Sequence, residues 1–209
     1  MKKLVCALGA VVCCSALSAR TIYVSSAGGG DGSGWGSETT LPAALAAAAD
    51  NDEIWLKVGE YALTDTLTTD KAVALIGGFA GNEASADART GTARSVLIGA
   101  DTAGTSCFEA TCAGGLDYTV KCDRIAFRHG NYRGFHKTGF SRTELVDCEF
   151  SGNGWGPTGG TAVFITGRGA CIDSTDASAV ALVTDCEFSQ NLIYTSNTYG
   201  GSDGGAGLL

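Results

Sequence analysis

Apolar and polar positions follow the same order in two separate segments of the chain. Residues 145–153 read LVDCEFSGN and residues 182–191 read LVTDCEFSQN, and a diverged third copy, RIAFRHGN, occupies residues 124–131 with one extra residue before its Asn. A unit that recurs at a period of roughly 20 to 50 residues is too small to bury its own apolar face. The pattern therefore predicts a stacked repeat architecture.

Within each copy, side chains alternate in a way that is typical of a strand with one buried face. In the 145–153 copy, the predicted inward side chains are Val146, Cys148 and Phe150. The predicted outward side chains are Asp147, Glu149 and Ser151. Short strands separated by Gly, Asn, Ser and Asp are compatible with a sandwich, a propeller or a solenoid. Because equivalent residues recur in the same phase, we expect parallel, in-register strands about 4.8 Å apart, with Phe on Phe, Cys on Cys and an Asn ladder at a corner.

The fold class that follows is all-β, a parallel β-helix with one short N-terminal helix. Residues 42–49 are rich in alanine after Pro42, which favours the first turn of a helix. A helix at this place would cap the exposed end of the first coil. Further strands are expected at residues 21–24, 53–58, 63–68, 72–79, 95–98 and 161–165, and the glycine-rich segment 25–37 is expected to be a surface turn.

The first 19 residues resemble no part of a folded domain. They contain two lysines, an apolar run and small residues near a plausible cleavage position, which together predict a secretory signal peptide. We expect residues 20–209 to form one β-helix domain, with an N-terminal cap at about 20–60 and coils at about 61–209, incomplete at the C-terminus. No later segment is apolar enough to predict a transmembrane span.

Charge narrows the range of partners. Once the two lysines of the signal peptide are removed, 22 acidic residues face 12 basic ones, a net charge of −10. Nucleic acid and anionic membranes both require a basic surface, so neither is expected as a partner. The predicted location is outside the cell, secreted or on the outer membrane or surface of a bacterium.

Cysteines of the mature chain leave two alternatives open. They are Cys107, Cys112, Cys122, Cys148, Cys171 and Cys186. An even number in an exported protein suggests disulfides, yet an unbridged ladder of small apolar side chains explains the Cys148 and Cys186 positions equally. No metal site is predicted, because the chain has no CxxC pair and His129 and His136 lack matching cysteine spacing.

Motifs in both halves of the chain resemble known surface proteins. FSGN at Phe150 with GGTAV from Gly159, and FSQN at Phe188 with GGAGL from Gly204, resemble the repeats of polymorphic outer-membrane autotransporter proteins. The N-terminal segments YVSSAGGGDGSGW, DEIWLKVGEY and LIGGFAGNEAS resemble bacterial surface proteins with a right-handed parallel β-helix of the pectin-lyase type. The resemblance implies a right-handed coil and a secreted or outer-membrane passenger that is often adhesive. It also implies that the chain is the N-terminal part of a longer protein.

Two functions from different classes follow. The first is a non-enzymatic adhesin or binding scaffold for an extracellular glycan or a host or cell-surface ligand. The second is a polysaccharide lyase or glycoside hydrolase, which would need paired carboxylates or a base with an acidic cation cluster. The candidate residues for such chemistry are the outward acids Asp147, Glu149, Asp185 and Glu187, with Arg124, Arg128, His129 and Lys137 nearby in sequence.

Solvated or ion-paired surface residues are the simpler interpretation of each of these candidates. No catalytic residue and no cofactor are therefore assigned, and the sequence favours a non-enzymatic protein. Weak calcium binding along Glu149 and Glu187 is an intermediate alternative, because stacked carboxylates repel unless a cation or a partner compensates them.

Overall fold

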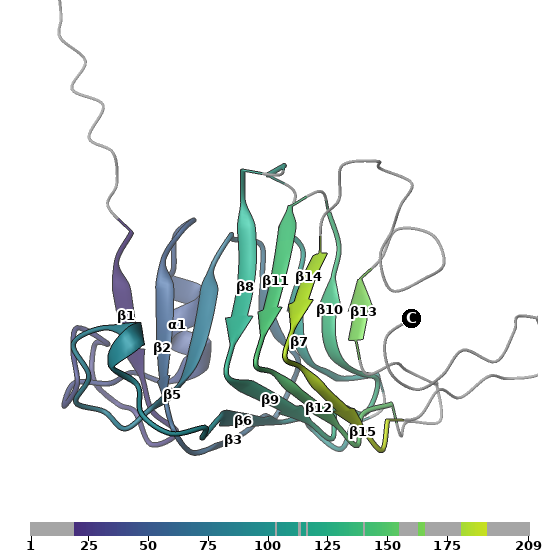
Figure 1. Ribbon diagram of the computed structural model, residues 1–209, viewed down its shortest axis with the longest axis horizontal. Helices are drawn as coiled ribbons and strands as arrows, with labels where there is room; N and C mark the ends of the chain where they lie inside the picture. The colour runs from purple at the N-terminus through teal and green to yellow at the C-terminus, as the bar shows by residue number, and fades with distance from the viewer. Residues whose placement is uncertain are drawn as a thin grey trace, which may run out of the picture.

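In a computed structural model, the chain folds into three parallel β-sheets (Figure 1). The structure describes residues 19–102, 104–112, 114–115, 117–139, 141–154, 163–165 and 181–191. Sheet A contains β1 (Thr21–Val24), β2 (Glu53–Lys57), β5 (Ala74–Phe79), β8 (Thr119–Asp123), β11 (Arg142–Val146) and β14 (Ala181–Thr184). Sheet B contains β3 (Glu60–Ala62), β6 (Ser95–Ile98), β9 (Ile125–Arg128), β12 (Glu149–Ser151) and β15 (Glu187–Ser189). Sheet C contains β4 (Leu67–Thr69), β7 (Ser106–Ala110), β10 (Arg133–Lys137) and β13 (Val163–Ile165).

The chain visits the three sheets in turn, so the coils that begin with β2, β5, β8 and β11 each contribute one strand to each sheet. From β2 onward, a strand pairs in parallel with the strand three places later. We number the coils by their sheet A strand: coil 1 starts with β1, coil 2 with β2, coil 3 with β5, coil 4 with β8, coil 5 with β11 and coil 6 with β14. This arrangement confirms the predicted right-handed parallel β-helix with its short N-terminal helix.

Aromatic rings stack along the core where the repeats are in phase. The rings of Phe127 and Phe150 lie 5.0 Å apart at 7°, and those of Phe150 and Phe188 lie 5.0 Å apart at 11°. Phe127 also contacts Phe135 of sheet C at 6.0 Å. Burial of these rings and of the aliphatic side chains around them supplies the main free energy that holds the coils together.

The repeated motif is not one strand, as its alternation predicted, but two strands joined at a corner. β11 ends at Val146 and β12 begins at Glu149, and Asp147 between them has a left-handed backbone with φ of 49°. The same conformation recurs at Arg124 and at Asp185 in the neighbouring coils. Val146 consequently belongs to the outer face, whereas Leu145 points into the core and is fully buried.

A second corner carries the predicted Asn ladder. The Asn153 side-chain amide donates to the carbonyl of Phe127, and its side-chain oxygen accepts from the backbone N–H of Gly130. Asn191 repeats the first contact one coil later by donating to Phe150. In the diverged copy, Gly130 rather than Asn131 takes the place of Asn153, because Gly130 lies against the Asn153 amide oxygen.

Left-handed angles at this second corner fall on the residues before the asparagines. They are His129, Gly152 and Gln190, with φ values of 56°, 64° and 55°. Asn tolerates this conformation better than most residues, yet here it falls on the residue before each Asn. The asparagines are used instead for their side-chain hydrogen bonds, which satisfy buried backbone groups of the turn.

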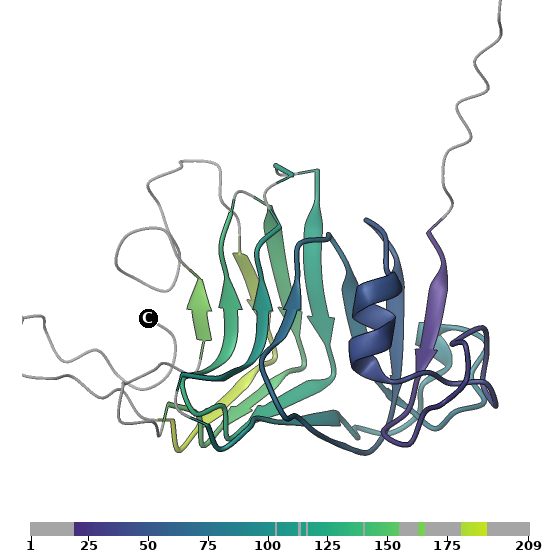
Figure 2. The same cartoon turned by 180° about the vertical axis from the view of Figure 1, so that it is seen from behind.

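Helix α1 (Leu41–Ala47) lies in the first coil beside the edge strand β4 (Figure 2). The side chain of Thr40 caps its N-terminus by accepting from the N–H of Ala43, and a proline occupies the first turn. Leu41, Ala44 and Leu45 are buried against the core. The helix therefore covers the end of the coil stack, as predicted.

Each of the five cysteines in the described part of the chain is a free thiol: Cys107, Cys112, Cys122, Cys148 and Cys186. This matches the unbridged alternative, while Cys171 lies outside the described residues. Burial raises the pKa of the Cys148 thiol well above its ordinary value. A hydrogen bond with Cys148 lowers the pKa of Cys186 to about 7.

Residues 1–18 of the predicted signal peptide and the motif at residues 204–208 lie outside the described residues. No helix within the described ranges has the length and apolar character that crossing a membrane requires.

Candidate functional site

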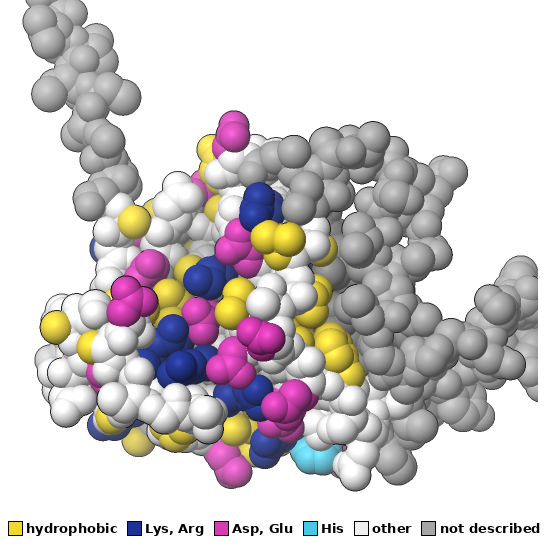
Figure 3. All heavy atoms as spheres, viewed as in Figure 1, with side chains coloured by type: hydrophobic (Ala, Val, Ile, Leu, Met, Phe, Trp, Pro, Cys, Tyr) yellow, Lys and Arg dark blue, Asp and Glu magenta, His cyan; other side chains and the backbone are white. Residues whose placement is uncertain are grey.

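The acids that the sequence marked as candidates lie at the corner between sheets A and B. Glu149 and Glu187 are register partners on β12 and β15, so they stack as predicted. Figure 3 shows basic and acidic side chains interleaved in a band on this face. The acids are therefore not an open ladder of carboxylates.

Arg94 compensates three of these acids at once. Its guanidinium lies 2.6 Å from a carboxylate oxygen of Asp147, 3.1 Å from Glu187 and 3.8 Å from Glu149. It also donates to the backbone carbonyl of Asp147. Carboxylates that are neutralised by an arginine have little free charge left for a cation.

Other arginines complete this network. Arg128 makes two hydrogen bonds to Glu149, at 2.8 and 2.7 Å, and Arg124 lies 3.4 Å from Asp147. Among the described residues, no group of three or more His, Cys, Asp or Glu side chains is placed to hold a metal ion. We call the following six residues the corner network: Arg94, Arg124, Arg128, Asp147, Glu149 and Glu187. Their mutual ion pairs are those of a network that stabilises the fold.

The remaining sequence candidates separate from this network. Asp185 is exposed at the corner of the last described coil, and His129 lies at the second corner. Lys137 is 1% exposed, and its ammonium donates to the backbone carbonyls of Cys112, Thr138 and Gly139. Burial lowers the pKa of Lys137 to about 8, so the side chain remains mostly protonated at neutral pH. It is a core residue that satisfies loop carbonyls.

A different group of polar side chains lies on the outer face of sheet C. Thr68, Glu109 and His136 are register partners on β4, β7 and β10. Their inward neighbours Leu67 and Phe108 are buried in the core, so these three side chains point outward. We call them the polar row. The row runs across the strands, along the axis of the β-helix.

Glu109 and His136 interact with each other and with two further side chains. The Glu109 carboxylate lies 3.4 Å from Nδ1 of His136 and 3.6 Å from Arg133, and it accepts a hydrogen bond of 2.9 Å from the Ser106 hydroxyl. Arg133 also lies 3.5 Å from Nδ1 of His136 and 3.7 Å above the ring of Tyr132. A carboxylate, an imidazole and a guanidinium thus share one small patch of surface.

The electrostatics of this patch keep His136 neutral. Burial is the main cause that lowers the pKa of His136, and the positive charge of Arg133 acts in the same direction. Glu109 opposes both, since a nearby carboxylate favours the imidazolium. A neutral imidazole beside a carboxylate can donate or accept hydrogen bonds and can take up a proton.

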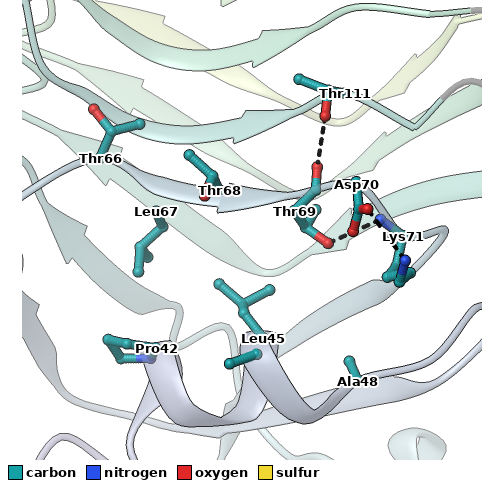
Figure 4. A pocket seen from close by; sticks show the side chains of 11 residues that line it. Pro42, Leu45, Ala48, Thr66, Leu67, Thr68, Thr69, Asp70, Lys71 and Thr111 are labelled. Atoms are coloured by element: carbon teal, nitrogen blue, oxygen red, sulfur yellow. Dashed lines mark hydrogen bonds and ion pairs between the residues drawn. The ribbon is translucent and has the colours of Figure 1, made fainter.

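A groove of about 470 Å³ lies at the β4 end of the polar row (Figure 4). Hydroxyl groups line its sheet side, and apolar side chains of α1 line the other. Its lining residues are Pro42, Leu45, Ala46, Ala48, Thr66, Leu67, Thr68, Thr69, Asp70, Lys71 and Thr111. A second cavity, of about 410 Å³, shares Pro42, Thr66 and Leu67 with it. Volumes of this size are typical of ligand sites.

Sequence reasoning missed the polar row, although a signal for it exists. CFEA at residues 107–110 and GFHK at residues 134–137 place a phenylalanine before Glu109 and before His136. Aligning the two buried phenylalanines, whose rings lie 5.8 Å apart, would have placed these polar side chains side by side on the outer face. Arg94 was missed because it follows a polar segment between two strands, and this segment resembles none of the repeated motifs.

Comparisons with known proteins give two structural similarities. One is to pectate lyase Pel9A, with a TM-score of 0.48 and 18% identity over 66% of this chain and 35% of that chain. The other is to a mutant of AlyGC, an alginate lyase of the PL6 family, with a TM-score of 0.43 and 16% identity over 82% of this chain and 20% of that chain. No protein-family model matches the chain, and no curated protein matches it significantly. The chain thus spans about a third and a fifth of the lengths of these two proteins.

Proposed function

We propose that this chain is a glycan-binding β-helix of an exported bacterial surface protein, and that the outer face of sheet C is its binding surface. The observation that carries the proposal is the outward row of Thr68, Glu109 and His136 on three successive strands. Parallel strands place such side chains about 4.8 Å apart along the axis. A line of hydrogen-bonding groups at this spacing suits a linear polymer of hydroxylated units better than a compact ligand.

The lengths of the charged contacts of Glu109 support a role in binding rather than a purely structural role. Glu109 lies 3.4 to 3.6 Å from its charged neighbours, whereas the shortest ion-pair contacts in the corner network are 2.6 Å for Asp147 and 2.7 Å for Glu149. Contacts as long as those of Glu109 are weak, so the Glu109 carboxylate can still accept hydrogen bonds from sugar hydroxyls. Tyr132 and Arg133 add a flat surface next to the row.

The binding protein in this proposal is a non-enzymatic adhesin or passenger scaffold at the cell surface. Its support is the predicted signal peptide, the acidic charge and the resemblance of the FSGN and FSQN motifs to polymorphic outer-membrane proteins. Such a scaffold holds its ligand without changing it, and the neutral His136 then acts as a hydrogen-bonding group.

Cleavage of an extracellular polysaccharide is the second candidate, and one observation favours it. A neutral imidazole fixed beside a carboxylate and a guanidinium can accept a proton from the sugar carbon that carries a carboxylate, while the arginine neutralises that carboxylate. The electron pair of the broken C–H bond then forms a carbon–carbon double bond, and the glycosidic oxygen on the adjacent carbon leaves and takes a proton from water. Hydrolysis by two carboxylates is less suited, because Glu109 is the only acid of the patch in the described part of the chain.

A glycan array probed with the full chain tests both candidates. Glu109→Gln removes the charge of the row, and Glu144→Gln is the matched control. Glu144 is an outward carboxylate on sheet A that is 27% exposed and paired with Arg142, whereas Glu109 is 26% exposed and lies near Arg133. The same mixtures are assayed for newly formed reducing or unsaturated sugar ends.

We expect binding without turnover, with at least a tenfold loss of affinity in Glu109→Gln and no change in Glu144→Gln. Release of unsaturated ends that depends on His136 would establish the enzymatic candidate instead. Equal effects of the two substitutions would exclude the outer face of sheet C as the site, and no binding to any glycan would refute the proposal.

A further inference from the structure

Helix α1 stands where the next strand of sheet C would lie. Sheet C ends at β4, which pairs only with β7 among the described strands, and α1 packs beside β4 on its open side. Figure 2 shows the helix in the same layer as the strands of sheet C. An α-helix with its side chains is about 10 Å across, so it rises above the surface of a neighbouring strand. The outer face of sheet C is consequently closed at this end.

The groove in front of this wall has two chemically different sides. Pro42, Leu45 and Ala48 form the apolar helix side, whereas the hydroxyl groups of threonines line the sheet side. At its rim the ammonium of Lys71 lies 3.1 Å from the Asp70 carboxylate. A sugar ring has the same division, with hydroxyl groups around its edge and C–H groups on its faces.

Thr68 belongs both to the groove and to the polar row. It lines the groove on β4, and it is the register partner of Glu109, which is in turn the partner of His136. The groove and the row are therefore one continuous surface. A chain that follows the row from β10 to β4 enters the groove and meets α1.

We infer that the groove binds the terminal unit of a glycan chain, so that this protein recognises chain ends and not internal segments. This inference rests on the proposed glycan-binding function and adds the form of ligand that the surface takes. A terminal unit carries a hydroxyl group that is bonded to another sugar in every internal unit. The hydroxyl side chains of the groove and the Asp70 and Lys71 pair can hydrogen-bond to that group.

The experiment compares chain ends with chain interiors. The probes are alginate, polygalacturonate and laminarin, each as long polymer, as short oligomer, and as oligomer blocked at the reducing or at the non-reducing end. The full chain is compared with Ala46→Tyr, which places a ring in the groove from an exposed helix position. Ala43→Tyr is the matched control, since Ala43 is exposed on the same helix and lines a different cavity.

For the glycan that is bound, we expect short oligomers to bind more tightly than polymer at equal sugar mass. Blocking one of the two ends should weaken binding at least tenfold, and Ala46→Tyr should do the same while Ala43→Tyr has no effect. Equal binding of blocked and unblocked oligomers would overturn the inference and leave glycan binding intact. No binding of any of the three glycans, together with no binding on the array, would overturn both.

Discussion

The corner network and the outer face of sheet C contain the same types of side chain in different arrangements. At the corner, Arg94 and Arg128 hold Glu149 and its neighbours in contacts as short as 2.6 Å. On sheet C, the corresponding contacts of Glu109 are 3.4 Å or longer. The difference teaches that acids and arginines of the same types can form a tightly paired structural network in one place and a looser polar patch in another, and only the looser patch is our proposed binding surface.

Replacing Phe150 should have the largest effect, because both surfaces rest on the same core. Phe150→Asp buries a charge between two stacked rings and should lower the free energy of unfolding by about 4 kcal/mol or more. Thermal denaturation followed by circular dichroism measures it. Ser151→Asp, the next residue on the outer face, is the control, and an unchanged melting temperature in Phe150→Asp would contradict the stacking.

Removing Arg94 should separate the two regions. Arg94→Ala leaves Asp147, Glu149 and Glu187 without their shared guanidinium, and we expect a loss of about 1 to 3 kcal/mol in stability because the side chains are partly buried. Glycan affinity should not change. The control Arg142→Ala breaks a single, more exposed pair with Glu144 and should cost less than about 1 kcal/mol. A loss of glycan binding in Arg94→Ala would mean that the two regions are not independent.

The smallest effect concerns pH and His136. Its pKa in the folded protein is lowered from the ordinary value near 6.5, mainly by burial and by Arg133, with Lys137 acting in the same direction and Glu109 opposing them. As the pH falls, the unfolded chain therefore protonates at this histidine before the folded protein does. The stability that neutral His136 provides is fully present above pH 6.5 and is lost as the pH falls through the pKa of the folded state. His136→Gln should show a smaller drop in melting temperature between pH 7.5 and pH 5 than the unchanged chain. Should His136→Gln and the control His129→Gln behave alike, His136 does not contribute to the pH dependence.

The coil architecture could be predicted because the repeats carry their own register. Phe127, Phe150 and Phe188 occupy equal positions in similar segments, and their rings stack in the folded protein. The break at Asp147 could not be predicted from alternation. A single left-handed residue turns the chain through a corner and shifts the inward and outward order before it by one position, so that Leu145 and not Val146 points into the core.

The candidate site was harder to predict than the fold, for a physical reason. Glu109 and His136 come from strands whose sequences are not similar, so only the three-dimensional register brings them together. Sequence reasoning singled out Asp147, Glu149 and Glu187 because they belong to a repeated motif. Repetition reflects stacking, and their arginine partner Arg94 lies 53 and 93 residues away from Asp147 and Glu187.

Arg94 also changes how the coils are coupled. In a protein built of stacked repeats, each coil touches only its neighbours, and the terminal coil can open without disturbing the rest. Arg94 extends from coil 3 past coil 4 to Asp147 in coil 5 and Glu187 in coil 6. Local opening of coil 6 must therefore break a contact that is anchored three coils away. Coils 3 to 6 should exchange their amide hydrogens as one cooperative unit, because Arg94 links the last described coil to coil 3.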